Sequence, residues 1–264
     1  MTTFVLVPGP YAGSWVWDEV TTHLRASGAE VHTTTLTGFG DRRHLAGPGV
    51  DLDAHIEDLV QVLDQLAAPD VVLVGHCYSI HPVLGAADRR PERIARLVFI
   101  DGAMPQDGHS ALDGLPDHLR EGLQQRIDAA EDGWRLTPPP LAEWQNWGSV
   151  DGIPADAMER LARLAAPQSV ATLTQPIRLT GAAEGLPLTG VFCTGNGMTI
   201  AMAEAAVASG APHFQPLVSP QVSFFQLDTG HWPMLSAPDE LAAVLLRAVA
   251  GEGHRVGVGA AVPA

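Results

Sequence analysis

Short runs of Val, Leu, Ile and Phe recur through about the first hundred residues, and this pattern restricts the fold more than any other feature. The predicted strands lie at 3–7, 30–35, 70–74 and 96–100. Amphipathic helical segments are expected between them, near 15–27, 53–67 and 79–89. Apolar strands without polar alternation, separated by helices, are typical of a parallel sheet buried on both faces. The first part of the chain therefore predicts an α/β fold with an open twisted sheet.

The alternation of strands and helices is interrupted over 105–187. This segment is rich in Pro and Gly, contains Pro138-Pro139-Pro140, and shows no convincing strand. We interpret it as a helical cap, or lid, inserted into a core formed by 1–104 and 188–250. The later predicted strands are 190–194 and 222–227, and the later predicted helices are 199–209 and 238–250. The final stretch, 251–264, is predicted to be a flexible tail.

Two stretches indicate a more specific fold. LVGHCYSI, residues 73–80, is typical of a sharp turn from a strand into a helix that exposes a nucleophile, and its central residue is Cys77. LDTGHWPM places His231 on a loop after the last predicted strand. A nucleophile on such a turn, followed late in the chain by a histidine, is the arrangement of the α/β-hydrolase fold. We therefore predict that fold, with a mostly parallel twisted sheet flanked by helices and an inserted helical cap.

The charge balance argues against two classes of partner. The chain carries 15 basic and 30 acidic side chains, for a net charge of −15. Such a surface repels nucleic acid and anionic membranes. No apolar run approaches the roughly 20 residues of a transmembrane helix, and the N-terminus does not resemble a signal peptide. We expect a cytoplasmic protein that acts on a small molecule, and the oligomeric state stays open, a homodimer included.

A family resemblance rests on five stretches that cover nearly the whole chain: FVLVPGPYAGSWVWDEV, TLTGFGDRRHLAGP, DLDAHIEDLVQVLDQL, LVFIDGAMPQDGHSALD and LDTGHWPMLSAPDEL. They resemble a bacterial esterase group related to plant methylesterases and hydroxynitrile lyases. In that family an elbow serine, an acid and a late histidine form the catalytic triad. The resemblance implies that Cys77 is the nucleophile, in place of serine, and that His231 is the base.

The acid of the triad requires a separate argument. Many α/β hydrolases place it after the penultimate strand, but CTGNGMTIAMAE has no carboxylate there before Glu204. The other known position is the end of the strand after the elbow helix, where RLVFIDG places Asp101 at the carboxyl edge of the sheet. We assign Asp101 to orient His231, with a structural turn or cap as the alternative. Asp228 is expected to stabilise the loop.

Cys77 has three interpretations: a catalytic nucleophile, an inert residue in a retired site, or an engineered replacement for serine. We favour the first. A cysteine at a helix N-terminus beside a histidine readily forms the reactive thiolate, so that a Cys-His pair is chemically sufficient. The second cysteine, Cys193, lies inside a predicted strand and is expected to be a core residue.

The loop after the first strand departs from the family pattern. The family usually has a His-Gly turn whose loop donates an N–H to the oxyanion, whereas this chain has Pro8-Gly9-Pro10. Pro10 has no N–H to donate. The remaining donor would be the N–H of Tyr78, with a side chain such as Tyr11 or Ser14 as a substitute for the missing one. Losing one donor typically costs about 2.7–4 kcal/mol of transition-state stabilisation.

A second departure is Ser79, which replaces the glycine that usually lets the elbow helix pack close to its strand. Its hydroxyl either crowds the turn or reaches the site. Trp144 and Trp147 in the cap, together with Trp232 beside the histidine, are assigned to substrate binding. The three tryptophans of the cap, Trp134, Trp144 and Trp147, favour a medium-sized apolar or aromatic substrate.

The leading hypothesis is acyl transfer from an ester, thioester or lactone to water or to a nucleophile within the substrate, plausible in secondary metabolism. The substrate is a small molecule, either free or bound to coenzyme A or a carrier protein. One alternative is a lyase, cyclase or rearrangement catalyst with His231 as base, and another is a retired hydrolase that binds a small ligand. No nucleotide loop or metal-ligand spacing is present in the sequence, so neither cofactor nor metal is expected.

Overall fold

The computed structural model describes residues 1–130 and 132–257, and it contains a six-stranded parallel sheet. The strands are β1 (Thr3–Val7), β2 (Glu30–Thr33), β3 (Val71–His76), β4 (Ile94–Ile100), β7 (Leu188–Cys193) and β8 (Val222–Leu227). Their order is β2-β1-β3-β4-β7-β8, and every neighbouring pair is parallel. Each lies within two residues of its predicted position. The predicted mostly parallel sheet is therefore confirmed.

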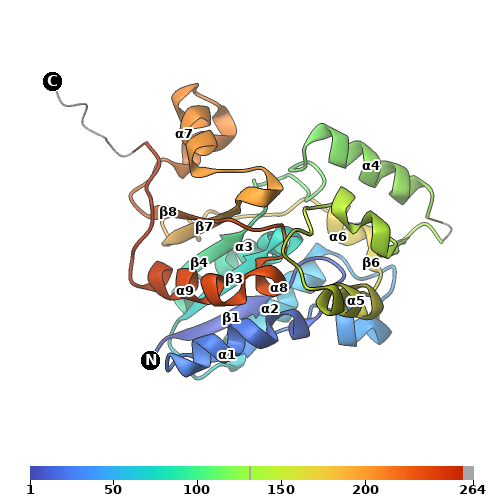
Figure 1. The fold of residues 1–264 in the computed structure, drawn as a ribbon, viewed down its shortest axis with the longest axis horizontal. Helices are drawn as coiled ribbons and strands as arrows, with labels where there is room; N and C mark the ends of the chain where they lie inside the picture. Colours follow the sequence, from blue (N-terminus) through green and yellow to red (C-terminus); the bar gives the residue numbers. More distant parts are fainter. Residues whose placement is uncertain (131, 258–264) are drawn as a thin grey trace.

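Helices cover both faces of this sheet (Figure 1). The helices of the core are α1 (Asp18–Ala26), α2 (Leu52–Gln65), α3 (Ile80–Arg89), α7 (Ile200–Ala208), α8 (Pro233–Ser236) and α9 (Pro238–Val249). The step from β1 to β2 and the step from β3 to β4 run in opposite directions along the sheet, so right-handed crossovers place α1 and α3 on opposite faces. Accordingly α1 packs against α9, and α2 packs against α3.

Local sequence explains α2 well. Asp51 caps its N-terminus, since the Asp51 carboxylate accepts a hydrogen bond from the N–H of Ala54 at 2.9 Å. Its apolar residues Ile56, Leu59 and Leu63 recur at helical spacing and are all buried. The helix therefore has one face for the sheet and one for solvent.

The segment predicted as a cap forms short elements that gather on the right of the view in Figure 1. They are α4 (Asp117–Asp128), β5 (Arg135–Leu136), η5 (Leu141–Asn146), α5 (Ala155–Leu164), β6 (Gln168–Ser169) and α6 (Val170–Thr174), where η denotes a 3₁₀ helix. The antiparallel pair of β5 and β6 differs from the prediction that this segment has no strand. With two residues in each strand, the pair is too short to produce an apolar alternation.

The C-terminal segment also differs from the prediction, because 251–257 lies against the edge of the sheet. The N–H of Phe224 in β8 donates to the carbonyl of His254 at 2.7 Å, and the N–H of His254 donates back at 2.8 Å. Val256 is buried. This part of the predicted tail covers the exposed edge of β8. Residues 258–264 lie outside the described part of the chain.

Candidate active site

Cys77 lies on a sharp turn between β3 and α3. The chain makes one 3₁₀ turn over Cys77–Ser79 (η3) and continues directly into the helix. Cys77 has a φ of 52°, in the left-handed region that costs a residue with a Cβ about 1–3 kcal/mol. The residue is only partly buried. The turn therefore has the strain and the accessibility expected of a position that presents a nucleophile.

Asp101 and His231 meet at the carboxyl edge of the sheet. His231 Nδ1 lies 2.5 Å from Asp101 Oδ2, and both side chains are 6% exposed. Asp101 follows β4 directly and has a φ of 46°. Its Oδ1 accepts a hydrogen bond from the N–H of Cys193 at 3.2 Å. The structure thus brings the predicted acid and base together, with the second carboxylate oxygen held by the end of β7.

Asn196 belongs to this site, although the sequence analysis missed it. It ends η6 (Thr194–Asn196), directly after β7, where many α/β hydrolases carry their acid. Its Nδ2 lies 2.8 Å from Asp101 Oδ2 and 3.2 Å from His231 Nδ1. Its Oδ1 accepts a hydrogen bond from the N–H of Ser149 in the cap at 2.9 Å. A polar side chain just beyond a strand at the carboxyl edge was the available signal in the sequence.

The protonation of His231 depends on both of its partners. Burial lowers the pKa of His231, but Cys77 and Asp101 outweigh burial and raise the pKa to about 10. Hydrogen bonds to both partners contribute to this rise. The site therefore favours an imidazolium, which is the charge that stabilises a neighbouring thiolate.

His76 holds the base from another side. The His76 and His231 ring centroids are 4.7 Å apart, and His76 Nε2 donates to the His231 carbonyl at 2.7 Å. Burial and the nearby His231 keep the pKa of His76 well below its ordinary value, so its ring is neutral. A Cβ at Gly9 would lie 2.5 Å from His76 Nδ1, so the loop after β1 passes directly against this ring. His76 is therefore a buried, neutral residue that contacts both His231 and the loop after β1.

The cap contacts the base through main-chain atoms. The N–H of His231 donates to the carbonyl of Ser149 at 2.7 Å, and the N–H of Gly230 donates to the carbonyl of Asp151 at 3.3 Å. A Cβ at Gly148 would lie only 2.7 Å from the Cβ of His231. Glycine at position 148 therefore permits the close approach of cap and base.

Aromatic side chains form a continuous series beside the base. Between ring centroids, Trp232 is 4.8 Å from His231 and Trp144 is 5.6 Å from Trp232. Tyr11 follows at 6.1 Å from Trp144. Trp147, only partly buried, lies further along the same cap segment. Three of the aromatic residues assigned to substrate binding are thus packed in series with His231.

The Tyr78 hydroxyl and the Ser14 backbone N–H are engaged elsewhere. The Tyr78 side chain points into the core, where its hydroxyl lies 2.9 Å from His55 Nδ1. Burial raises the pKa of Tyr78, so this hydroxyl stays protonated. The N–H of Ser14 donates to Thr35 Oγ1 at 2.8 Å. Of the Tyr78 groups, the main chain is therefore the part that can act at the elbow.

The loop that contains Pro10 is tied to the elbow by Ser79. The Ser79 hydroxyl is fully buried and donates to the carbonyl of Pro8, so it does not reach the site. The close strand-to-helix approach is met instead at Gly75, where a Cβ would lie 3.0 Å from the Ser79 carbonyl oxygen. Tyr11 follows Pro10 with a φ of 65°, and its N–H makes no hydrogen bond with any described residue.

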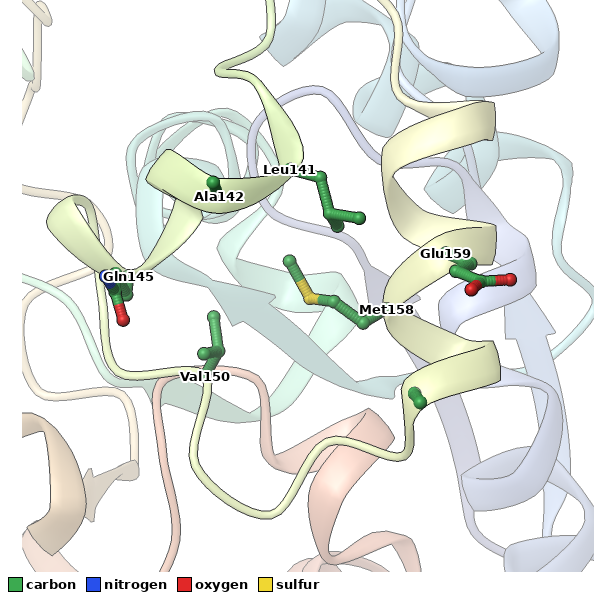
Figure 2. Close-up of a pocket in the computed structure, with 7 residues that line it drawn as sticks. Leu141, Ala142, Gln145, Val150, Met158 and Glu159 are labelled. Atoms are coloured by element: carbon green, nitrogen blue, oxygen red, sulfur yellow. The ribbon is translucent and has the colours of Figure 1, made fainter.

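Two hollows lie away from these residues. One, of about 280 Å³, is lined by Leu141, Ala142, Gln145, Val150, Ala155, Met158 and Glu159. Figure 2 shows it between η5 and α5. The other, of about 510 Å³, lies beside α3 and β4, and its lining includes Leu84, Phe99 and Leu179. Neither is lined by Cys77, Asp101 or His231.

Cys193 is buried at the end of β7, and burial raises the pKa of its thiol. Within 1–130 and 132–257, no three His, Cys, Asp or Glu side chains are grouped as a metal ion would require. In the same ranges, no helix combines the length and the apolar character needed to cross a membrane.

Known proteins resemble the chain over almost its full length. The model of the alpha/beta hydrolase family matches residues 4–244. Over 253 residues the chain is 31% identical to the carbendazim hydrolyzing esterase of Nocardioides sp. (strain SG-4G), which covers 93% of this chain and 98% of that protein. Plant methylesterases match over shorter stretches.

Solved structures share the fold. An extracellular α/β-hydrolase from a Paenibacillus species, described as sharing structural and functional homology with tobacco salicylic acid binding protein 2, has a TM-score of 0.77 at 21% identity. That likeness covers 94% of this chain and 99% of the other. Tomato methylketone synthase I, in complex with beta-ketoheptanoate, has a TM-score of 0.70 at 19% identity over 95% and 98%. The chain therefore belongs to the α/β-hydrolase family, in an esterase group related to plant methylesterases.

Proposed function

We propose that this protein is a cysteine-dependent acyl-transfer enzyme, acting on an ester, thioester or lactone of a medium-sized apolar or aromatic molecule. One observation carries the proposal: His231 Nδ1 is hydrogen-bonded to Asp101 Oδ2, and Cys77 and Asp101 together raise the pKa of this imidazole. The left-handed backbone of Cys77 on an accessible turn supports its assignment as nucleophile. The likeness to an esterase along nearly the whole chain supports acyl chemistry.

The proposed reaction has two halves. In the first, the sulfur of Cys77 attacks the carbonyl carbon, and the leaving alcohol or thiol takes the proton held by His231 as its bond breaks. In the second, water or a nucleophile within the substrate attacks the thioester and gives its proton to His231. The product, a carboxylic acid when water attacks or a cyclic molecule when the internal nucleophile attacks, is released, and the thiolate-imidazolium pair is restored. Asp101 holds the imidazole in orientation throughout.

The oxyanion of the tetrahedral intermediate needs donors other than Pro10. The N–H of Tyr78, directly after the nucleophile, is the first that we propose. The N–H of Tyr11 is the second, because it has no described partner and its loop passes the elbow. A Cβ at Gly9 in that loop would lie 3.5 Å from the Cys77 Cβ.

The proposal is tested by intact-protein mass spectrometry after brief exposure to p-nitrophenyl acetate, and separately to iodoacetamide, across pH 5 to 9. The wild type is expected to gain one acetyl group at Cys77, and His231→Ala is expected to slow that gain. Cys193→Ala is the matched control, because it removes the buried thiol. It should label as the wild type does, whereas Cys77→Ala should gain no acetyl group.

Pro10 favours a second candidate function, in which His231 acts as a base without a covalent intermediate, as in a lyase, cyclase or rearrangement catalyst. A site short of one oxyanion donor stabilises a tetrahedral intermediate poorly, while abstraction of a proton depends mainly on the base. The variant Cys77→Ala distinguishes the two functions by its turnover. Acyl transfer predicts that this variant loses turnover, and base catalysis predicts that it retains turnover.

A further inference from the structure

Arg126, on the cap helix α4, has an unusual environment for a surface-helix arginine. Its guanidinium lies over the Trp147 ring, 4.7 Å from the centroid, and its Nη2 donates to the carbonyl of Thr137. Its Nη1 is buried and has no hydrogen-bond partner among the described residues. Within the same residues, Arg126 forms no ion pair with a carboxylate. A buried donor on a charged group is costly to leave unpaired, which indicates a missing acceptor.

Other donors lie near Arg126. The indole Nε1 of Trp144 is also buried without a partner among the described residues. Tyr11 packs against the Trp144 ring, and Arg126 acts to lower the pKa of its hydroxyl. Burial raises the pKa of Tyr11 to about 12 even though Arg126 opposes the rise, so the hydroxyl remains protonated. This group of side chains is therefore rich in donors.

Tyr11 also links these donors to the nucleophile. It lies two residues after Gly9, where a Cβ would lie 3.5 Å from the Cys77 Cβ. Its ring is also in series with Trp144, Trp232 and His231, at centroid distances of 6.1, 5.6 and 4.8 Å. Arg126, Trp144 and Tyr11 therefore border the position where an acyl group bound to Cys77 would extend. The chain as a whole carries a net charge of −15, which repels anions. Arg126, which has no described carboxylate partner, would attract an anion locally.

We propose that Arg126 binds a carboxylate at the far end of the acyl group, so that the preferred substrates are half-esters or half-thioesters of dicarboxylic acids. This inference rests on the proposed acyl-transfer function. A carboxylate carries one negative charge, matching one guanidinium, and it accepts hydrogen bonds without donating any. The aromatic rings of Trp144 and Trp147 flank the apolar chain between the two ends of such a substrate.

The test compares two p-nitrophenyl esters of equal chain length, mono-p-nitrophenyl adipate and p-nitrophenyl hexanoate. The measured quantity is the ratio of their kcat/KM values, adipate over hexanoate. Wild type is expected to prefer the adipate, and Arg126→Gln to lower the ratio by roughly 10- to 100-fold through KM, as for loss of a charged hydrogen bond. Arg126→Lys keeps the charge and should retain part of the preference.

Arg120→Gln is the matched control, because Arg120 lies on the same helix in an exposed pair with Asp117. It should leave the ratio unchanged. The anchor role is overturned if Arg126→Gln lowers kcat/KM equally for both esters, since Arg126 would then only support the cap. It is also overturned if the wild type shows no preference for the adipate.

A binding measurement separates this inference from the proposed function. Calorimetry of adipate with Cys77→Ala requires no turnover, and binding is expected to be lost in the double variant with Arg126→Gln. If neither ester is turned over and adipate still binds through Arg126, the acyl-transfer function fails and the carboxylate anchor stands. If both esters form acyl-enzyme and adipate binding is independent of Arg126, the anchor fails and acyl transfer stands.

Discussion

The polar groups at the edge of the sheet and those in the cap differ in whether they have hydrogen-bond partners. At the sheet edge, Asp101 and His231 are bonded to each other and to further groups, among them Asn196. In the cap, Arg126 and Trp144 each keep a buried donor without a described partner. In the proposed function the paired groups position the reaction, and in the proposed anchor the unpaired Arg126 donor is available to a ligand. Under these two proposals, chemistry and substrate choice are carried by separate parts of this chain.

Backbone conformation shows the same division. Tyr11, Cys77 and Asp101 are the only residues other than glycine that have positive φ in the described part of the chain. All three follow strands of the sheet at its carboxyl edge. Each costs about 1–3 kcal/mol and persists because the surrounding sheet fixes it. In the described cap residues, positive φ occurs only at glycine.

The strongest test of this division is Asp101→Asn. Asparagine tolerates the left-handed backbone at this position and keeps the size of the side chain. It removes the charge that orients and stabilises the imidazolium. We expect kcat to fall by roughly 10⁴-fold, as for the equivalent change in a serine protease, with little change in the melting temperature. A loss of less than tenfold would show that the paired residues of the sheet edge do not carry the chemistry.

Gly148→Ala tests the contact between the two regions. The added Cβ would lie 2.7 Å from the Cβ of His231, so the base or the cap must shift. We expect kcat to fall by roughly 10- to 100-fold, as for a misplacement of about 1 Å. Gly122→Ala, on α4, is the control, since its Cβ would lie 3.9 Å from Trp147. Equal effects of the two changes on kcat would refute a specific effect on the base.

The smallest expected effect concerns pH and stability. His231 has a folded pKa raised from 6.5 to about 10, so its contribution to the free energy of unfolding is complete below about pH 6.5. That contribution is lost as pH rises through about 10. Urea unfolding of wild type and His231→Gln should therefore converge as pH increases toward 10.

An imidazole titration by NMR should also show a lower pKa for His231 in Cys77→Ala. The reason is that Cys77 is one of the two groups that raise this pKa. If the unfolding difference between wild type and His231→Gln grew with pH, the imidazolium would not be the stabilised form.

The sequence predicted the parts of this molecule that depend on local pattern. The strands were predictable because buried parallel strands are uninterrupted apolar runs. Asp101 was predictable because the carboxyl ends of such strands share one edge. Asn196 and His76 were not assigned, because their roles depend on how distant loops close around His231. Arg126 has the sequence context of an ordinary solvent-exposed arginine on a helix, and only burial of Nη1 distinguishes it.

The close contact between cap residues 148–151 and the loop 229–231 that carries His231 has a consequence for chimeric enzymes. Gly148 has no room for a Cβ beside His231, and Gly230 has none beside the carbonyl of Ser149. A cap transplanted from another member of the family would place that member's residues, in the position of 148–151, against the 229–231 loop of this protein. A graft of 105–187 alone would therefore displace the base, whereas one that exchanges both segments would keep it. The proposed substrate preference would then be transferred as two pieces that are distant in the sequence.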